Sequence, residues 1–441
     1  MRSERKSIRA KLRDNRRTSR RRERRGKPSR GAASADRTEV GDDEGRPRFL
    51  AVDFFCGAGG TTRGLIDAGG YVLAGIDKER KCERTYVENN DNLHWDKLPP
   101  KFLARDVFAK SEDHPDGEQE ELAEELRTLI AAARKRFPDV PLLFAICAPC
   151  QPFTTLSRNP MSKERLDKRK RDSNLLRAAL EFVREHEPEL VLSENVAGIS
   201  DPRFGGIWAD FKEELERLGF ATGAKAVCVS RFGVPQRRKR SILLAAKRGK
   251  VLDARFADLL GGELVVPDQD PDAPAATVEK AIGHLPALAA GEAHPEIPNH
   301  RTRSLSELNI KRISSAKPGE TNRYMERTEH GDLSLACHRR VNARLTTRGF
   351  NDVYTRMRPD GPSPTITTRC HSISNGRFGH YDTNQNRGIS LREAAALQSF
   401  EDDYVFYPTG QIEPVARMIG NAVPPRLARF FADYLVDSLR T

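Results

Sequence analysis

The residues best suited to catalysis are a cysteine and a glutamate, each of which follows a short apolar segment. Cys150 comes after the apolar run Leu142–Ala148 and stands between two prolines, so its loop can present the sulfur rigidly. Such a thiol becomes a nucleophile where nearby cations or dipoles favour its thiolate. Glu194 closes the segment Leu190–Ser193, where a carboxylate serves either as an acid or only as a helix cap. Taken alone, the position of Glu194 favours the helix cap, and Cys150 is the candidate nucleophile.

A glycine-rich turn indicates a ligand site. The stretch Asp53–Gly60 contains three glycines, which let a backbone turn tightly and approach a ligand closely. Asp77 ends the next apolar segment, Tyr71–Ile76, where a carboxylate can accept hydrogen bonds from ribose hydroxyls. A tight strand-to-helix turn would explain the glycines alone, but the added aspartate favours a nucleoside cofactor.

A basic run, Pro235–Arg240, precedes the apolar segment Ile242–Ala245. Such a run is usually a solvated face. In an extended strand, however, alternate side chains point to the same side. Arg238 and Arg240 would then share one side and could converge on one anionic or carbonyl-bearing group.

No metal site is expected. Cys147 and Cys150 form a Cys-x-x-Cys pair, but the sequence holds no second such pair to complete a zinc site. Cys147 lies inside the apolar run and is expected to be a buried, inert thiol.

These residues need a scaffold that brings the ends of several apolar segments together. From Phe49 onward, short apolar segments alternate with amphipathic stretches such as Leu175–His186 and Trp208–Leu218. This alternation predicts an α/β fold with a doubly wound, mostly parallel sheet. Ligands of such sheets bind outside the carboxyl ends of the strands, where every motif above falls. Strands are expected at Leu50–Phe55, Tyr71–Ile76, Leu142–Cys147, Leu190–Ser193, Ala224–Val229 and Ile242–Ala245.

Composition divides the chain into four parts. Residues 1–47 are expected to be a disordered basic tail, since the first 30 hold 15 basic and 3 acidic residues, a difference that equals the whole net charge of +12. Residues 48–250 are expected to form the large α/β domain. Residues 251–386, rich in Pro, Gly, Arg and His, indicate a smaller, loop-rich domain. Residues 387–441 are expected to add two amphipathic helices.

Composition also excludes several classes of protein. With 37% hydrophobic and 31% charged residues among 441, the chain suits a globular protein with a large core. No apolar run approaches the roughly 18 residues that span a bilayer, and no apolar segment follows the basic N-terminus, so neither a membrane nor a secretory signal is expected. Seven cysteines, odd in number and irregularly spaced, favour a reduced, cytoplasmic chain over a disulfide framework.

Taken in order, these motifs resemble those of DNA (cytosine-5) methyltransferases over roughly residues 49–250 and 350–441. The resemblance rests on Pro149-Cys150-Gln151, Glu194-Asn195-Val196, Gln236 with Arg238 and Arg240, Arg358–Thr368, and Gly420-Asn421-Ala422-Val423. It implies a Rossmann-like methyltransferase sheet with a second, smaller target-recognition domain. It also implies that residues 387–441 return the chain to the catalytic domain.

The resemblance implies a role for each of these residues. Cys150 would add to C6 of a cytosine, which makes C5 nucleophilic enough to take a methyl group from S-adenosylmethionine. Glu194 would assist at N3, and Arg240, with Arg238, would hold the base carbonyl. The cytosine would be flipped out of the duplex, and no metal would take part. The implied cofactor-binding residues are Phe55, Gly57, Ala58, Gly59, Gly60, Asp77, Asp106, Val107, Pro149, Asn421 and Ala422.

The chain departs from the family's pattern in places. Asp77 stands where many relatives have glutamate, and Lys78 follows it where an aromatic or apolar residue is common. The acidic, helical insert Ala109–Phe137 is longer than the family minimum and has no assigned role. The basic stretch Thr154–Arg171 is expected to close over DNA and contact its phosphates. Some of the arginines of the small domain are expected to read guanines, and the sequence does not show which; the candidates are Arg339, Arg340, Arg344, Arg348 and Arg377.

The expected partner is double-stranded DNA, and a cognate restriction endonuclease is a candidate second partner. A monomer suffices for this chemistry. Such an enzyme would be cytoplasmic, and associated with the nucleoid in a prokaryote.

Two alternatives stay open. A transfer-RNA (cytosine-5) methyltransferase shares these motifs but usually has a shorter recognition region and a Cys-Phe-Thr element, whereas Phe153-Thr154 lacks the cysteine. An inactive DNA-binding paralogue would have lost Cys150 or Glu194, and both are present.

Overall fold

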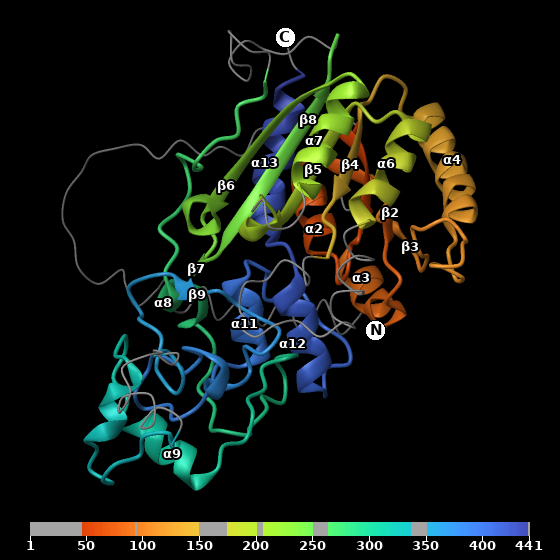
Figure 1. Cartoon of the computed structure of the whole chain (residues 1–441). Coiled ribbons are helices and arrows are strands. Elements are labelled where there is room, and N and C mark those ends of the chain that lie inside the picture. The colour runs from red at the N-terminus through yellow and green to blue at the C-terminus, as the bar shows by residue number, and fades with distance from the viewer. Residues whose placement is uncertain are drawn as a thin grey trace, which may run out of the picture.

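The larger part of the molecule is built around a seven-stranded sheet (Figure 1). The computed structural model describes residues 46–92, 95–149, 174–200, 206–249, 263–336 and 351–439. Across the sheet the strands are ordered β3-β2-β1-β4-β5-β8-β6. They are β1 (Phe49–Phe54), β2 (Gly70–Ile76), β3 (Lys101–Leu103), β4 (Leu142–Ile146), β5 (Leu190–Val196), β6 (Phe220–Cys228) and β8 (Lys239–Lys247).

The sheet is mostly parallel, as predicted. Neighbouring strands from β3 to β5 pair in parallel, whereas β8 runs antiparallel to both β5 and β6. Every residue of β1 and β4 is buried, because helices cover both faces of the sheet. The doubly wound α/β architecture is therefore confirmed. The sequence does not predict the antiparallel direction of β8, since an apolar run carries no mark of strand direction.

Helices cover the two faces in separate groups. One face carries α4 (Gln119–Arg136), α6 (Leu175–His186) and α7 (Ile207–Arg217), and the other carries α2 (Gly60–Asp67) and α13 (Pro425–Asp437) (Figure 1). In α13, Leu427, Phe431 and Leu435 recur every four residues and are all buried in the core. Gly64 of α2 lets α13 approach, because a Cβ on it would lie 2.4 Å from the carbonyl oxygen of Pro425.

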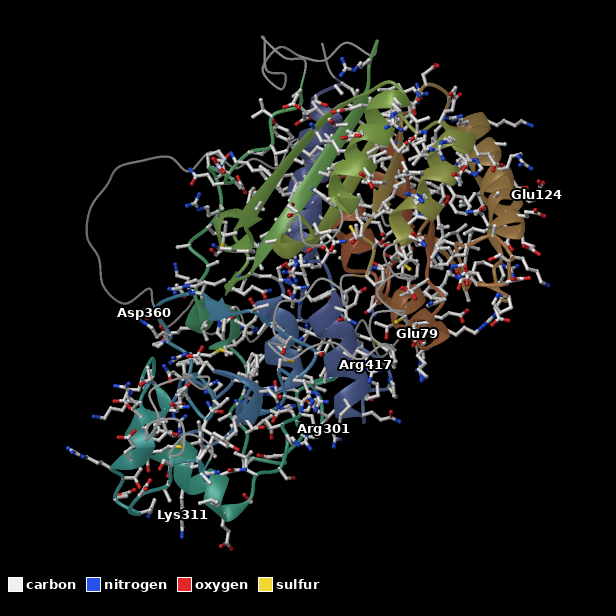
Figure 2. The ribbon with its side chains drawn as sticks, viewed as in Figure 1. Glu79, Glu124, Arg301, Lys311, Asp360 and Arg417 are labelled. Carbon is white, nitrogen blue, oxygen red and sulfur yellow. The ribbon has the colours of Figure 1, made fainter. Side chains whose placement is uncertain are left out.

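The acidic insert predicted at Ala109–Phe137 contains helix α4, which begins at Gln119. Its apolar stripe of Leu122, Leu126 and Ile130 is buried against the sheet. Its acidic side chains face outward, and Figure 2 shows Glu124 pointing away from the molecule. Among the helices of the described ranges, none combines the length and the apolar character that a membrane crossing requires.

A second, smaller group of elements lies below the sheet in Figure 1. It contains α8 (Val278–Ile282), α9 (Glu307–Ser314), α11 (Leu391–Leu397), α12 (Ile412–Asn421) and a small sheet of β7 (Gln236–Arg237) and β9 (Ser363–Pro364). The core around α11 and α12 includes Ala58, which follows β1, so the two parts share apolar contacts. The described part of residues 251–386 is poor in strands, in agreement with the loop-rich domain expected there, since β9 covers only Ser363–Pro364.

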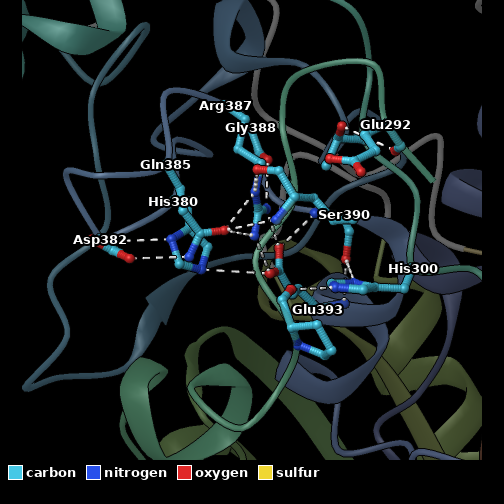
Figure 3. A network of polar contacts seen from close by, with 12 residues as sticks. Glu292, His300, His380, Asp382, Gln385, Arg387, Gly388, Ser390 and Glu393 are labelled. Carbon is cyan, nitrogen blue, oxygen red and sulfur yellow. Dashed lines mark hydrogen bonds and ion pairs between the residues drawn. The ribbon is translucent and has the colours of Figure 1, made fainter. Parts of the chain in front are cut away.

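A buried polar network fixes the start of α11 (Figure 3). Ser390 and Glu393 form a capping box, in which each side chain accepts a hydrogen bond from the other's backbone N–H. Arg387 donates to both carboxylate oxygens of Glu393 at 2.7 Å. His300 Nδ1 lies 2.9 Å from Ser390 Oγ, and His380 Nε2 lies 3.5 Å from Glu393 Oε1. The buried charges are thus partnered, the condition under which a protein interior tolerates them.

Candidate active site

Glu194 and Arg240 form a close, buried ion pair. The register of β5 and β8 pairs Val196 with Arg240 and Glu194 with Ile242, so Glu194 and Arg240 are diagonal neighbours on one face of the sheet. Arg240 Nε lies 2.6 Å from Glu194 Oε1, and the two side chains are 9% and 11% exposed. The contact does not have the angle of a hydrogen bond, and Glu194 Oε1 accepts none from the described residues. The arginine therefore balances the charge of a carboxylate whose oxygen can still accept a bond from a ligand.

The residues on either side of Glu194 hold the end of the neighbouring strand β4. Ser193 Oγ donates to the carbonyl of Ile146, and Asn195 Nδ2 donates to that of Ala148 at 3.1 Å. Both side chains are buried. These bonds fix the chain just before Pro149, the residue that precedes the expected nucleophile. Sequence reasoning did not assign this role to Asn195, although the residue belongs to a motif that it singled out.

Cys150 itself and the basic stretch Thr154–Arg171 lie outside the described residues. Cys147, three positions earlier, is half-buried. Burial, followed by the negative charges of Glu194 and Asp53, raises the pKa of the Cys147 thiol well above its ordinary value. Cys147 therefore stays a thiol, in agreement with the inert role expected for it.

The glycine-rich turn between β1 and α2 lies beside Asp77, as expected for a ligand site. Asp77 Oδ2 accepts the N–H of Gly57 at 2.9 Å, and Asp77 Oδ1 accepts the N–H of Glu79 at 2.8 Å. Burial raises the pKa of Asp77, although these two hydrogen bonds oppose the rise. Each carboxylate oxygen keeps a second lone pair, so Asp77 can also accept hydrogen bonds from a ligand.

The turn is open on one side and tightly packed on the other. Gly57 and Gly59 have φ of +51° and +87°, values that favour glycine. Among the described residues, a Cβ on Gly57 would meet only Asp77 Oδ2, at 4.0 Å, so these residues leave the space above it open to a ligand. A Cβ on Gly59 would lie 2.4 Å from Asn90 Nδ2, and one on Gly60 would lie 2.3 Å from the carbonyl oxygen of Val423. The turn therefore forms a cradle that is filled from beneath.

The other expected cofactor residues border this cradle or follow neighbouring strands. Ala422 Cβ would lie 3.4 Å from a Cβ on Gly60, which places the end of α12 against the turn. The N–H of Asp77 donates to the carbonyl of Leu103 at 3.2 Å, so Asp77 lies beside the end of β3. The chain then reaches Asp106, whose Oδ1 accepts the N–H of Phe108 at 3.1 Å. The remaining members of the expected set that the structure describes are Phe55, Ala58, Val107, Pro149 and Asn421.

The two arginines of the basic run do not converge on one group, contrary to the expectation. Arg238 is 4% exposed, and its Nη1 donates to the carbonyls of Ile366 at 2.9 Å and Gly420 at 3.1 Å. Arg240 instead pairs with Glu194. Arg238 thus joins the segment that follows β9 to α12 through their backbones. Its direction depends on segments far along the chain, which the local spacing could not reveal.

One of the candidate guanine-reading arginines, Arg377, lies within the described residues. Arg377 Nη1 donates to the carbonyl of Glu320 at 2.6 Å, and its Nη2 pairs with Asp352 at 3.0 Å. Arg377 therefore binds within the protein. The others, Arg339, Arg340, Arg344 and Arg348, lie outside the described residues. Within the part of the chain that the structure describes, no three or more His, Cys, Asp or Glu residues gather as a metal site would require.

Comparison with known proteins agrees with this geometry. A family model described as C-5 cytosine-specific DNA methylase matches residues 104–437. The Type II methylase M.HgiDII of Herpetosiphon aurantiacus is 33% identical over 383 residues, which cover 86% of this chain and 93% of the relative. The Type II methyltransferase M1.HphI of Haemophilus parahaemolyticus is 29% identical over 382 residues, which cover 87% of this chain and 85% of the relative.

Solved structures share the fold. A putative DNA modification methyltransferase encoded within a prophage (E. coli) superposes with a TM-score of 0.59 at 19% identity, covering 89% of this chain and 100% of that one. The methyltransferase EhMeth of Entamoeba histolytica gives a TM-score of 0.52 at 12% identity, covering 89% and 99%.

These findings define the class of protein: the chain belongs to the C-5 cytosine-specific DNA methylase family. Enzymes of this family are S-adenosylmethionine-dependent methyltransferases. The protein is accordingly a DNA (cytosine-5) methyltransferase.

Proposed function

We propose that the enzyme methylates C5 of a flipped-out cytosine within a specific sequence of double-stranded DNA, through a transient bond between Cys150 and C6 of the base. The observation that carries the proposal is the buried pair of Glu194 and Arg240, 2.6 Å apart, beside the strand end that leads to Cys150. The Type II methylases among the relatives support a role in a restriction–modification system, with a cognate endonuclease as partner.

The residues would share the chemistry as follows. The thiolate of Cys150 adds to C6, and the electron pair of the C5–C6 bond makes C5 an enamine carbon. Glu194 binds N3 and favours the charge that the addition places on the ring. Arg240 holds Glu194 in position and lies where it can bind the base carbonyl. After C5 has gained the methyl group, its proton leaves for a base, the C5–C6 double bond re-forms and the thiolate departs.

The cradle fits S-adenosylmethionine, which supplies an electrophilic methyl group when bound. The open face above Gly57 admits a ligand, and Asp77 can accept the ribose hydroxyls. We propose that the methionine end lies near the glycine turn and that Phe55 meets the adenine ring. The further residues proposed to line the site are Ala58, Gly59, Gly60, Asp106, Val107, Pro149, Asn421 and Ala422.

We propose that residues 251–386 recognise the DNA sequence and that residues 48–250 and 387–441 form the catalytic part. The stretch Thr154–Arg171 is proposed to close over the DNA, because seven Lys and Arg residues there can bind phosphates. Arg238 is proposed to act by fixing the backbone of Gly420, beside the cofactor cradle, since its side chain is already bound to carbonyls.

The experiment offers the purified enzyme two substrates, double-stranded DNA and total transfer RNA, with labelled S-adenosylmethionine. We expect label in DNA alone, recovered after hydrolysis as 5-methylcytosine. Label in transfer RNA alone would instead support the RNA alternative.

DNA that carries 5-fluorocytosine tests the covalent step, because fluorine cannot leave C5 as a cation and the bond between Cys150 and C6 is therefore not broken. A denaturant-stable complex is expected with the wild type and not with Cys150→Ala, and its absence from both would contradict the covalent route.

A further inference from the structure

The underside of the cofactor cradle rests on a segment from the far end of the chain. Residues Asp402–Tyr407, which follow α11, are here called the strap. The hydroxyl of Tyr404 donates to the carbonyl of Ala58, the residue between Gly57 and Gly59. Asn90 Nδ2 donates to Tyr404 Oη at 3.1 Å and to the carbonyl of Tyr86 at 2.8 Å. A tyrosine more than 340 residues away in sequence thus holds the backbone of the cradle.

The contact is buried and specific. Tyr404 is 3% exposed and Asn90 is fully buried. Burial raises the pKa of Tyr404, so its hydroxyl stays protonated and able to donate. The ring of Tyr404 lies 4.6 Å from that of Phe400 and 5.3 Å from that of Phe406, centroid to centroid. The ring therefore fills the core, while the hydroxyl makes a separate polar contact that packing alone does not require.

The strap is fastened on both sides by asparagines. Asn89, at the end of α3 (Glu83–Asn89), accepts the N–H of Val405 at 2.8 Å and donates to its carbonyl at 2.7 Å. Asn299 accepts the N–H of Phe406 at 2.8 Å and donates to its carbonyl at 2.8 Å. α3 follows the cofactor strand β2, whereas Asn299 belongs to the region proposed to recognise DNA. The strap thus joins the two regions through paired hydrogen bonds.

The start of the strap is held as firmly. Arg392 of α11 is fully buried, and its Nη1 donates to the carbonyl of Tyr404 at 2.6 Å. His284 Nε2 lies 2.8 Å from Asp402 Oδ2. Because its backbone is fixed at successive residues, the strap can set where the Tyr404 hydroxyl meets the cradle.

We propose that the strap is a positioning element for S-adenosylmethionine and that the Tyr404 hydroxyl is the group through which it acts. The inference rests on the proposed cofactor site. With the carbonyl of Ala58 held inward, the peptide that precedes Gly59 has one orientation, and the open face above Gly57 keeps the shape that receives the ligand. Loss of the hydroxyl leaves that buried carbonyl unpaired and lets the turn relax. The loss therefore weakens cofactor binding more than it slows the chemistry.

The test compares Tyr404→Phe with the wild type and with Tyr324→Phe. Tyr324 Oη likewise binds two backbone carbonyls, those of Arg312 and Tyr354. Neither of these two residues belongs to the glycine turn or to the strap. For Tyr404→Phe, we expect the calorimetric Kd for S-adenosylhomocysteine and the KM for S-adenosylmethionine to rise about fivefold to twentyfold, with kcat within about twofold. Tyr324→Phe should leave that Kd unchanged. A Kd within twofold of wild type for Tyr404→Phe, or an equal rise for Tyr324→Phe, overturns the inference.

A second variant tests the strap rather than the tyrosine. Asn299→Gly keeps the positive φ of 63° at this position but removes both bonds to Phe406. We expect its Kd for S-adenosylhomocysteine to rise about twofold to fivefold, although the side chain of residue 299 binds the strap and not the glycine turn. An unchanged Kd overturns the part of the inference that concerns the strap. If the wild type itself bound no S-adenosylhomocysteine, the proposed function would fall first, whereas failure in the variants alone leaves that function standing.

Discussion

At the scale of the residue, Glu194 is held in place by its ion pair with Arg240. Its buried carboxylate faces Arg240 at 2.6 Å, and its Oε1 accepts no hydrogen bond from the described residues. A carboxylate with a hydrogen bond left to make is suited to bind a ring nitrogen that becomes charged during the reaction. The flanking residues Ser193 and Asn195 leave it free for this, because their own side chains bind the neighbouring strand.

Replacing Glu194 by glutamine keeps the shape of the side chain but removes its negative charge and its ability to exchange a proton. We expect kcat to fall by about two to four orders of magnitude, because both acid–base assistance and electrostatic stabilisation are lost. Single-turnover methyl transfer measures the effect. Glu124→Gln, on the exposed face of α4, is the matched control and should keep wild-type kcat. A loss below tenfold in Glu194→Gln would count against its role.

The sequence predicts candidate site residues but not all of their partners. Asp77, the glycine turn, Glu194 and Arg240 fall where strand ends meet, as their spacing predicts. The partners of Arg238 and the support that Tyr404 gives to the turn come from residues more than 120 positions away. Such contacts depend on how loops fold back on the sheet, and periodicity carries no information about that.

At the scale of the element, β4 and β5 are tied together next to the nucleophile loop. Asn195 on β5 donates to the carbonyl of Ala148, two residues before Cys150. Asn195→Ala should lower kcat about fivefold to a hundredfold, because one buried bond lost costs about 1–3 kcal/mol and loosens the loop. Cofactor Kd should stay within about twofold of wild type, because the Asn195 side chain binds the carbonyl of Ala148 and not the glycine turn or Asp77. Loss of cofactor binding with normal kcat would contradict this assignment.

The elements themselves were predicted unevenly. The apolar runs predicted β1, β2, β4, β5, β6 and β8, and the amphipathic stretch Leu175–His186 matches α6 at both ends. The three residues of β3 are too few to show a period. Helix α12 carries Pro414 in its first turn, a position that tolerates proline but breaks the sequence signal for a helix. Predicted ends differ by a few residues, because apolar pattern marks burial rather than hydrogen bonding.

The buried network at α11 predicts a dependence of stability on pH. Burial lowers the pKa of His380 from 6.5 to about 4. The unfolded chain therefore binds the proton first, and the stability that neutral His380 confers is complete above pH 6.5 and is lost as the pH falls towards 4. Burial raises the pKa of Glu393, but Arg387 outweighs it and lowers the value to about 2, so this contribution is lost only below about pH 4.5.

We therefore expect the melting temperature to fall by about 2–5 °C between pH 6.5 and 4.5 through His380. His380→Asn should flatten the profile in this interval, because asparagine can still accept the N–H of Asp382 but does not titrate. His330→Asn, an exposed histidine of the same region, is the control and should leave the slope unchanged. Thermal unfolding monitored by circular dichroism measures both, and equal slopes for His380→Asn and wild type would show that another group dominates.

At the scale of the whole molecule, the net positive charge comes from the N-terminal residues and not from the rest of the chain. The +12 equals the excess of 15 basic over 3 acidic residues in positions 1–30, so the rest of the chain is balanced. Basic charge that binds phosphates regardless of sequence raises affinity and is weakened by salt. The residues proposed to read DNA are elsewhere, in residues 251–386.

Deleting residues 1–30 should weaken DNA binding about tenfold or more at 50 mM salt and by less at 200 mM, because counterion release governs this contribution. The methylated sequence should not change. Fluorescence anisotropy over a salt series gives the affinity, and sequencing of the modified DNA gives the target. A shortened protein that modified a different sequence would show that the tail takes part in recognition.

We propose that this chain methylates C5 of cytosine in one DNA sequence through Cys150. The most direct measurement is to produce the wild type and Cys150→Ser in cells that lack cytosine methylation, and to map modified bases across the genome. We predict 5-methylcytosine at one recurring sequence with the wild type and none with Cys150→Ser, although the variant still binds DNA. Methylation on a nitrogen of cytosine or adenine, or equal 5-methylcytosine from both proteins, would show that the enzyme does not act on C5 through Cys150.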